Sequence, residues 1–231
     1  MLLIISPAKK LDFSSKVTTK KYTIPDLLTN SAYLIEHLKQ CSIEDLTKLM
    51  NISYGVAEKN VQRFIEWNTP FTPENAKQAI FAYDGDVYRG LNASELNDED
   101  ISYAQKSLRI ISGLYGILKP LDLIQPYRLP LSTKLVTSKA KNLYKFWGEK
   151  LTNEINNTIA ETESNYLVNL ASNEYFKALN KSDINAEIIT PIFKQNKNGV
   201  YRVVSFYAKR ARGLMSNFIV KNKIKTIEEL K

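Results

Sequence analysis

Three cations stand close together where a predicted strand meets a predicted helix. An alternating apolar stretch, residues 200–206, leads directly into Lys209, Arg210 and Arg212. Arginine can bind a phosphate through two parallel hydrogen bonds, and lysine adds a compact positive charge. Positive charge at the start of a helix opposes the helix dipole, so we expect these side chains to have another role, such as clamping a phosphate. The alternative interpretation is a charged, solvated helix start.

A glycine turn in the middle of the chain is a second place where an anion could bind. Gly113 and Gly116 stand three apart between two apolar runs, and glycine accepts the positive φ that a tight turn requires. Such a turn points several backbone N–H groups in one direction, which attracts anions. Three cations bracket it: Arg109, Lys119 and Arg128. The pattern predicts a helix-hairpin-helix-like element at about 101–128, which would grip a nucleic-acid backbone without reading bases. The alternative is a buried loop with solvated charges.

Acidic and basic side chains also follow the first predicted strand, residues 2–6. Lys9 and Lys10 leave that strand with Asp12 close behind, and loops at strand ends commonly carry functional sites. Asp84 and Asp86 form part of a later turn, but the spaced oxygen ligands of a calcium loop are absent from the sequence there. His37 and Cys41 are the only residues of their types, and two ligands without a third make no metal site. We therefore expect neither a metal nor a cofactor.

The net charge of +8 is distributed unevenly along the chain. Residues 1–100 carry 11 Lys/Arg and 14 Asp/Glu, a net of −3, whereas residues 101–231 carry 21 and 10, a net of +11. This asymmetry indicates a polyanionic partner for the second part of the chain. The alternative is that the lysines only keep the protein soluble. No apolar run approaches the roughly 20 residues that cross a bilayer, and the start of the chain is not a secretory signal. A single cysteine fits a reducing cytosol.

Apolar periodicity predicts a mixture of helices and strands. Helical patterns fill residues 25–67, with Ser42 as an N-cap, and another helix runs through 102–108. Strands are expected at 2–6, 79–83, 166–170 and 186–193, with a hairpin turn at 196–199. In the last helix Leu214, Met215, Phe218 and Ile219 should form the apolar face. We expect one compact domain over residues 1–231, of the α/β or mixed α+β class, with a helical N-terminal insertion.

Eight blocks of residues closely resemble the motifs of the YaaA family, in the same order. They are Ser6-Pro-Ala-Lys9, Gly85-Asp-Val-Tyr88 with Gly90-Leu91, Ser112-Gly-Leu-Tyr-Gly116, Lys119-Pro-Leu-Asp122, Gln125-Pro-Tyr-Arg128, Phe146-Trp-Gly148, Asn169-Leu-Ala-Ser172 with Glu174-Tyr-Phe176, and Ser205-Phe-Tyr-Ala-Lys209 with Ala211-Arg-Gly213. The resemblance covers nearly the whole chain. It implies a cytosolic bacterial protein of the peroxide-stress response that limits free iron and oxidative damage. It also implies an α/β fold with a helix-hairpin-helix-like element and a cationic cleft for double-stranded DNA. Family members usually continue beyond Lys231 with a tail containing glycine and aromatic residues.

Two hypotheses about function follow, and the sequence favours a binding protein over an enzyme. In the first, a cationic groove binds double-stranded DNA without sequence preference. Its expected contacts are Lys9, Lys10, Arg109, Gly113, Gly116, Lys119, Arg128, Lys209, Arg210 and Arg212. In the second, the same cleft is an active site for a small anionic or nucleotide-like substrate. Its candidate residues are Lys9, Asp12, Asp86, Arg128, Glu174 and Lys209. A buried Asp12 or Glu174 beside Lys209 in a narrow pocket would favour the enzyme, and a broad open groove lined with exposed cations would favour DNA.

Overall fold

A computed structural model describes residues 1–230, apart from the side chain of Lys197. A five-stranded sheet lies at its centre in the order β6-β5-β1-β8-β9. The strands are β1 (Leu2–Ile5), β5 (Leu108–Ser112), β6 (Gly116–Leu118), β8 (Tyr166–Leu170) and β9 (Glu187–Ile189). β1, β5, β8 and β9 run parallel, and β6 is antiparallel to β5. The α/β class predicted from the sequence is confirmed.

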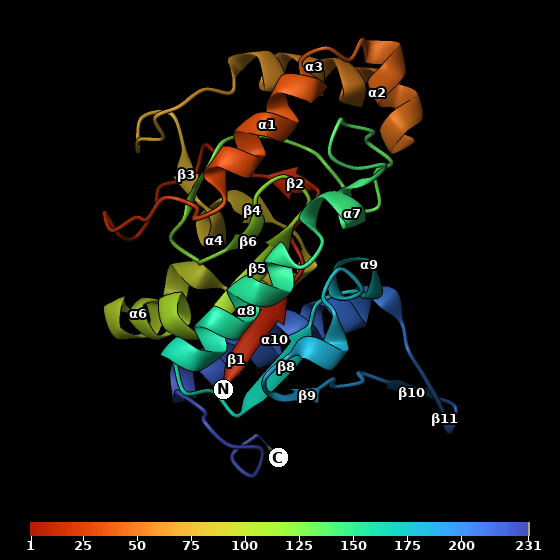
Figure 1. Ribbon diagram of the computed structural model, residues 1–231. Coiled ribbons are helices and arrows are strands. Elements are labelled where there is room, and N and C mark those ends of the chain that lie inside the picture. The colour runs from red at the N-terminus through yellow and green to blue at the C-terminus, as the bar shows by residue number, and fades with distance from the viewer. Residues whose placement is uncertain (231) are drawn as a thin grey trace.

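Strand β1 is buried on both faces of the sheet. All four of its residues have no exposed surface, as continuous apolar strands of covered parallel sheets do. Helix α8 (Lys150–Glu161) lies in front of the sheet in Figure 1, and α10 (Ser205–Asn222) lies behind it. The sheet is therefore an inner layer, and its strand ends are the places where loops can form a site.

The predicted helical insertion is present as three helices grouped at one end of the molecule (Figure 1). They are α1 (Leu28–Leu38), α2 (Ile43–Met50) and α3 (Tyr54–Glu66). Ser42 caps α2 as predicted: its side chain accepts from the Asp45 N–H, and the Asp45 carboxylate accepts from the Ser42 N–H. This reciprocal capping box explains why the sequence signal was clear.

Shorter elements connect this helical group to the sheet. The helices are α4 (Ala79–Ala82), α5 (Asp86–Leu91), α6 (Asp98–Ser107), α7 (Leu143–Trp147) and α9 (Asn173–Phe176). Two small antiparallel pairs join β2 (Lys10–Leu11) to β4 (Tyr83–Asp84) and β3 (Lys77–Gln78) to β7 (Leu123–Ile124). The strand expected at 79–83 is wrong, because residues 79–82 form α4. The hairpin of β10 (Gln195–Lys197) and β11 (Val200–Arg202) is present and projects from the body in Figure 1.

The glycine turn joins two strands rather than two helices. β5 and β6 pair as an antiparallel hairpin in which Ser112 lies opposite Gly116, whose φ is 71°. The apolar run 108–111 is a strand because it pairs with β1, a tertiary contact that local periodicity cannot reveal. The helix-hairpin-helix-like element expected at 101–128 is therefore absent from this described segment. Only its first part, α6, is helical.

Helix α10 crosses α5 at two glycines, which corrects the face predicted for it. A Cβ on Gly90 would stand 2.5 Å from the Arg210 carbonyl oxygen, so only glycine permits this approach. Small residues therefore face the body, while Leu214 and Phe218 are 54% and 48% exposed. The predicted apolar face holds for Ile219, which is fully buried, and for Met215, which is partly buried against the core. The crossing brings the first turns of α10 beside the start of α5.

Candidate anion-binding site

A cavity of about 440 Å³ opens where the central parallel strands end. Ser6 follows β1 and Ser172 follows β8, and both line it. The chain passes from β1 to β5 on one side and later returns to β8 on the other, so the cavity lies at a switch point of the sheet. Ligands of open α/β sheets bind at such points, outside the carboxyl ends of the strands. We call this cavity the strand-end pocket.

Five predicted cations line the strand-end pocket: Lys9, Lys10, Arg128, Lys209 and Arg212. Lys10 is paired with Asp84 at 2.5 Å. Among the described residues, the other four make no ion pair with a carboxylate. Burial lowers the pKa of Arg212, because a charged guanidinium loses hydration there. The pocket thus holds more positive charge than its own acids neutralise.

Arg128 supplies the most specific sign of a ligand. Its Nε atom is buried and has no hydrogen-bond partner among the described residues. A buried donor without a partner is unfavourable by about 1–3 kcal/mol, and a charged one by more. Arg128 also lines the pocket, so an anion bound there would lie beside this arginine. The chemistry of the donor fits a phosphate or carboxylate group.

The three acids of the strand-end pocket differ in their partners. Asp84 accepts from Lys10 and from Arg89 Nε, the latter at 3.2 Å, and these cations lower its pKa. Asp86 Oδ1 lies 3.9 Å from Arg89 Nη1. Glu174 instead accepts through Oε1 from the backbone N–H and hydroxyl of Ser132, at 3.2 and 2.9 Å. Glu174 and Lys209 line the same cavity, and Glu174 is partly buried rather than buried.

Two serines and three tyrosines also line the strand-end pocket, and none of them was predicted to be a site residue. Ser6 Oγ accepts from the Ser172 N–H at 2.8 Å, which ties the ends of β1 and β8 together. Tyr88, Tyr127 and Tyr175 line the same cavity. Two of these tyrosines directly neighbour singled-out residues, Tyr127 before Arg128 and Tyr175 after Glu174. That adjacency was the available signal.

Several predicted DNA contacts lie elsewhere, because they are structural. Arg109 is only 6% exposed, and its guanidinium donates to Thr158 Oγ1 and to three backbone carbonyls. Gly113 and Gly116 are buried, and Trp147 Nε1 donates to the Gly113 carbonyl at 3.0 Å. A phosphate backbone cannot reach these groups. The expectation that Arg109, Gly113 and Gly116 contact DNA is therefore wrong.

The remaining predicted residues lie outside the strand-end pocket but near the surface. Lys119 pairs with Asp26 at 2.7 Å. Arg210 is exposed on α10 and is not among the residues that line the strand-end pocket. Asp12 is occupied by the turn that follows it, accepting from the backbone and hydroxyl groups of Ser14 and Ser15. These bonds hold the pKa of Asp12 well below its usual range. Asp12 thus acts as a turn cap here.

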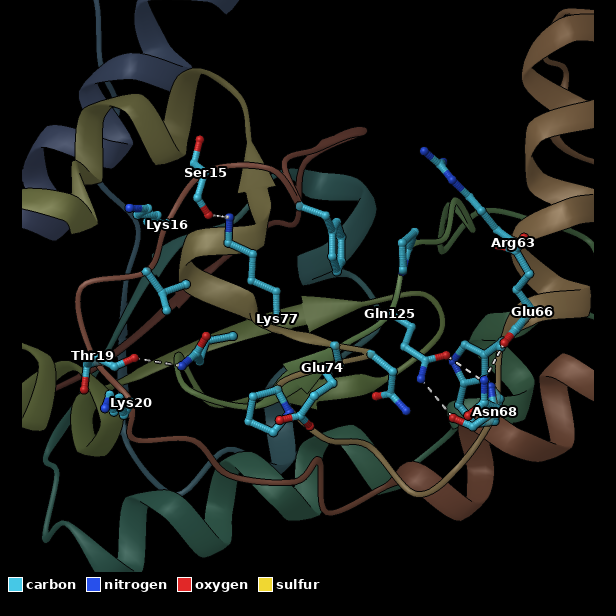
Figure 2. A pocket seen from close by; sticks show the side chains of 18 of the residues that line it. Ser15, Lys16, Thr19, Lys20, Arg63, Glu66, Asn68, Glu74, Lys77 and Gln125 are labelled. Carbon is cyan, nitrogen blue, oxygen red and sulfur yellow. Dashed lines mark hydrogen bonds between the residues drawn. The ribbon is translucent and has the colours of Figure 1, made fainter.

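A larger cavity of about 1050 Å³ lies between the segment 13–20 and the end of α3. Lys77 is 6% exposed, and its ammonium donates to the carbonyls of Asp12 and Ser15 at 2.9 and 2.8 Å. Figure 2 shows Lys77 hydrogen-bonded to Ser15, and Gln125 hydrogen-bonded to the neighbouring Asn68. Its most buried polar groups are already bonded to protein. This cavity therefore carries less evidence of a ligand than the strand-end pocket.

Two features are absent from the part of the chain that the structure describes. No group of three or more His, Cys, Asp or Glu side chains there could hold a metal ion. None of the described helices is both long and apolar enough to span a bilayer.

Fold and site together define a mixed α/β protein with a cationic pocket at the carboxyl ends of its parallel strands. The family described as peroxide stress protein YaaA matches residues 1–231, and the chain belongs to that family. A UPF0246 protein of Aliivibrio fischeri is 52% identical over all of this chain and 89% of its own length. UPF0246 proteins of Colwellia psychrerythraea and Pseudoalteromonas translucida are 52% and 51% identical, over 90% and 89% of their lengths. The resemblance seen in the sequence is confirmed.

Proposed function

We propose that this peroxide stress protein binds a small, phosphate-bearing molecule in the strand-end pocket. The observation that carries the proposal is one cavity lined by Arg128, Lys209 and Arg212. The buried Nε of Arg128 has no hydrogen-bond partner among the described residues. A volume of about 440 Å³ lies within the roughly 300–1,000 Å³ of small-molecule sites. A cavity of this size encloses a small molecule rather than a long phosphate backbone.

The direct test is titration of the full chain with inorganic phosphate by isothermal calorimetry. Arg128→Gln and Lys209→Gln should each weaken binding at least about tenfold, because each removes a charge-assisted hydrogen bond. Lys221→Gln, an exposed cation at the other end of α10, is the matched control and should bind as the wild type does. Equal affinities for all four proteins would contradict the proposal.

Binding of double-stranded DNA is a second candidate function, supported by a different observation. The stretch 188–227 contains nine Lys/Arg and no Asp or Glu. Its exposed cations include Arg202 and Arg210, which lie outside the strand-end pocket. In this account the duplex would bind along the projecting hairpin and the start of α10, in the cytoplasm. Such binding would accompany the limitation of free iron and oxidative damage that the resemblance implies.

Fluorescence anisotropy with a random-sequence duplex at several salt concentrations tests the second candidate. Affinity should fall with a log–log slope of about −0.9 per phosphate neutralised, and flat salt dependence would contradict it. The triple variant Lys209→Ala/Arg210→Ala/Arg212→Ala should lose binding. Arg210→Ala alone should lower the affinity for duplex DNA and leave the affinity for phosphate unchanged, because Arg210 does not line the pocket.

A further inference from the structure

One wall of the strand-end pocket is made of aromatic rings whose hydroxyls are already used. The Tyr88 hydroxyl donates to the Ser6 carbonyl at 3.1 Å. The Tyr127 hydroxyl lies 2.6 Å from both the Tyr83 hydroxyl and Ser112 Oγ. Tyr88 and Tyr127 are each less than one-tenth exposed and their hydroxyls are bonded to protein, so neither offers the cavity a free donor. An inorganic anion alone would gain no binding energy from contact with aromatic rings.

Tyr175 adds a half-buried ring to this wall and comes from α9 at the end of β8. It stands next to Glu174 in sequence, whereas Arg128 stands next to Tyr127. Each aromatic contribution is therefore paired with a charged one on the same backbone segment. A ligand that lay on the rings would have a cation and a carboxylate within the same cavity.

Glu174 is placed to accept from the ligand. Its Oε1 is held by the N–H and hydroxyl of Ser132, which fixes the orientation of the carboxylate. Among the described residues, Oε2 receives no hydrogen bond from protein. A carboxylate with one oxygen anchored and one available can accept from sugar hydroxyls or from an amino group. Phosphate itself would be repelled there, so Glu174 selects for a different part of the ligand.

We infer that the strand-end pocket binds a nucleoside monophosphate, with the phosphate at Arg128, Lys209 and Arg212. The planar base lies against the tyrosine wall, since every base presents a π-face to aromatic side chains. Ribose hydroxyls or the base edge donate to Glu174. A sugar phosphate would leave the aromatic wall unused, and a nucleoside would leave the cations unused. This inference rests on the proposed function and names the class of its ligand.

Calorimetric titration of the full chain with AMP, GMP, CMP and UMP tests it, beside ribose 5-phosphate and inorganic phosphate. At least one monophosphate should bind about tenfold or more tightly than ribose 5-phosphate, because stacking of the base adds to the phosphate contacts. Equal affinity of ribose 5-phosphate and all four nucleotides would overturn the inference while leaving the proposed function standing. Failure of phosphate and all phosphorylated ligands to bind would overturn both.

Substitutions of Tyr175 and Glu174 test which part of the ligand each side chain contacts. Tyr175→Leu should abolish the advantage of the nucleotide over ribose 5-phosphate and keep phosphate affinity, whereas Tyr175→Phe should retain the advantage. Glu174→Gln should weaken nucleotide binding several-fold and leave phosphate binding unchanged or stronger. Glu174→Gln keeps the test decisive if Tyr175→Leu does not fold. Nucleotide affinities unchanged in Glu174→Gln and in every folded Tyr175 variant would contradict the assignment.

Discussion

Gly213 of α10 lies so close to α5 that a Cβ on it would stand 1.9 Å from the Val87 carbonyl oxygen. No side chain can occupy that space without separating the helices, because the neighbouring atom is rigid backbone. Gly213→Ala should therefore lower the free energy of unfolding by about 2–3 kcal/mol. Phosphate affinity should also fall, because Lys209 and Arg212 are carried by the same helix. Urea unfolding and calorimetry measure the two effects.

Gly55 provides the matched control for this substitution. It lies in α3, is exposed, and a Cβ there would meet nothing within 4 Å. Gly55→Ala should leave stability unchanged or raise it by up to about 1 kcal/mol, since alanine is the better helix former. Equal losses in both variants would show that the crossing of α5 and α10 is not specially tight.

The Lys77 ammonium holds the segment that follows β2 against the body. It donates to the Asp12 and Ser15 carbonyls, and burial lowers its pKa. Lys77→Met should reduce stability by about 1–3 kcal/mol and speed proteolytic cleavage within 13–21. The exposed Lys16 lies in that segment, and Lys16→Met should change neither quantity. Undiminished protease resistance of Lys77→Met would contradict this role.

Asp122 should make stability depend on pH. It is fully buried, accepts from Thr23 Oγ1 and the Lys119 N–H, and its burial raises the pKa to about 6 from an ordinary value of 3.8. A raised pKa in the folded state favours folding at low pH, and this contribution is lost as pH rises through about 6. Between pH 4.5 and 7.5 the loss should be about 2 kcal/mol. Urea unfolding at several pH values measures it.

Asp122→Asn removes that titration and keeps an acceptor for the Lys119 N–H. The difference in unfolding free energy between wild type and Asp122→Asn should therefore shift by about 2 kcal/mol over the same pH interval. Contributions from other titrating groups cancel in this difference. A constant difference from pH 4.5 to 7.5 would show that Asp122 is ionised throughout.

Ser42 and Ser53 both stand at the N-cap position of a helix, but only Ser42 makes a capping hydrogen bond with its side chain. Ser42 caps α2 within the reciprocal box with Asp45, whereas the Ser53 side chain makes no capping hydrogen bond to α3. Ser42→Ala should lower the free energy of unfolding by about 1 kcal/mol, and Ser53→Ala should change it by much less. Comparable losses, measured by urea unfolding, would mean that the capping bond has no net effect.

Local chemistry explains what the sequence could predict of this fold. The helices around Ser42 and after Asn97 carry capping boxes, which are signals contained within a few residues. The run 108–111 has no such signal, and only its pairing with β1 makes it a strand. Likewise, Leu214 and Phe218 have the spacing of a buried apolar face, yet both are exposed. The close contact of α10 with α5 at Gly213 and Gly90 places small residues on the buried side of the helix instead. Tertiary contacts overrode the local pattern in both cases.

The candidate site was predicted in part for a similar reason. Lys9, Arg128, Glu174 and Lys209 lie on separate segments of the chain, and the fold brings them to one pocket. Charge next to an expected strand end was a sufficient signal for them. Arg109 carries the same charge but lies within β5, where its guanidinium satisfies backbone carbonyls. Residue type alone could not separate a ligand contact from a buried structural cation.

Location of a bound anion tests the central claim most directly. Crystals of the full chain grown with tungstate, a heavy analogue of phosphate, would reveal the anion by anomalous scattering. The account predicts a peak in the strand-end pocket, close to Arg128 and Lys209. A protein that binds tungstate in solution but shows its peak only elsewhere, for example along the hairpin of β10 and β11, would contradict the account.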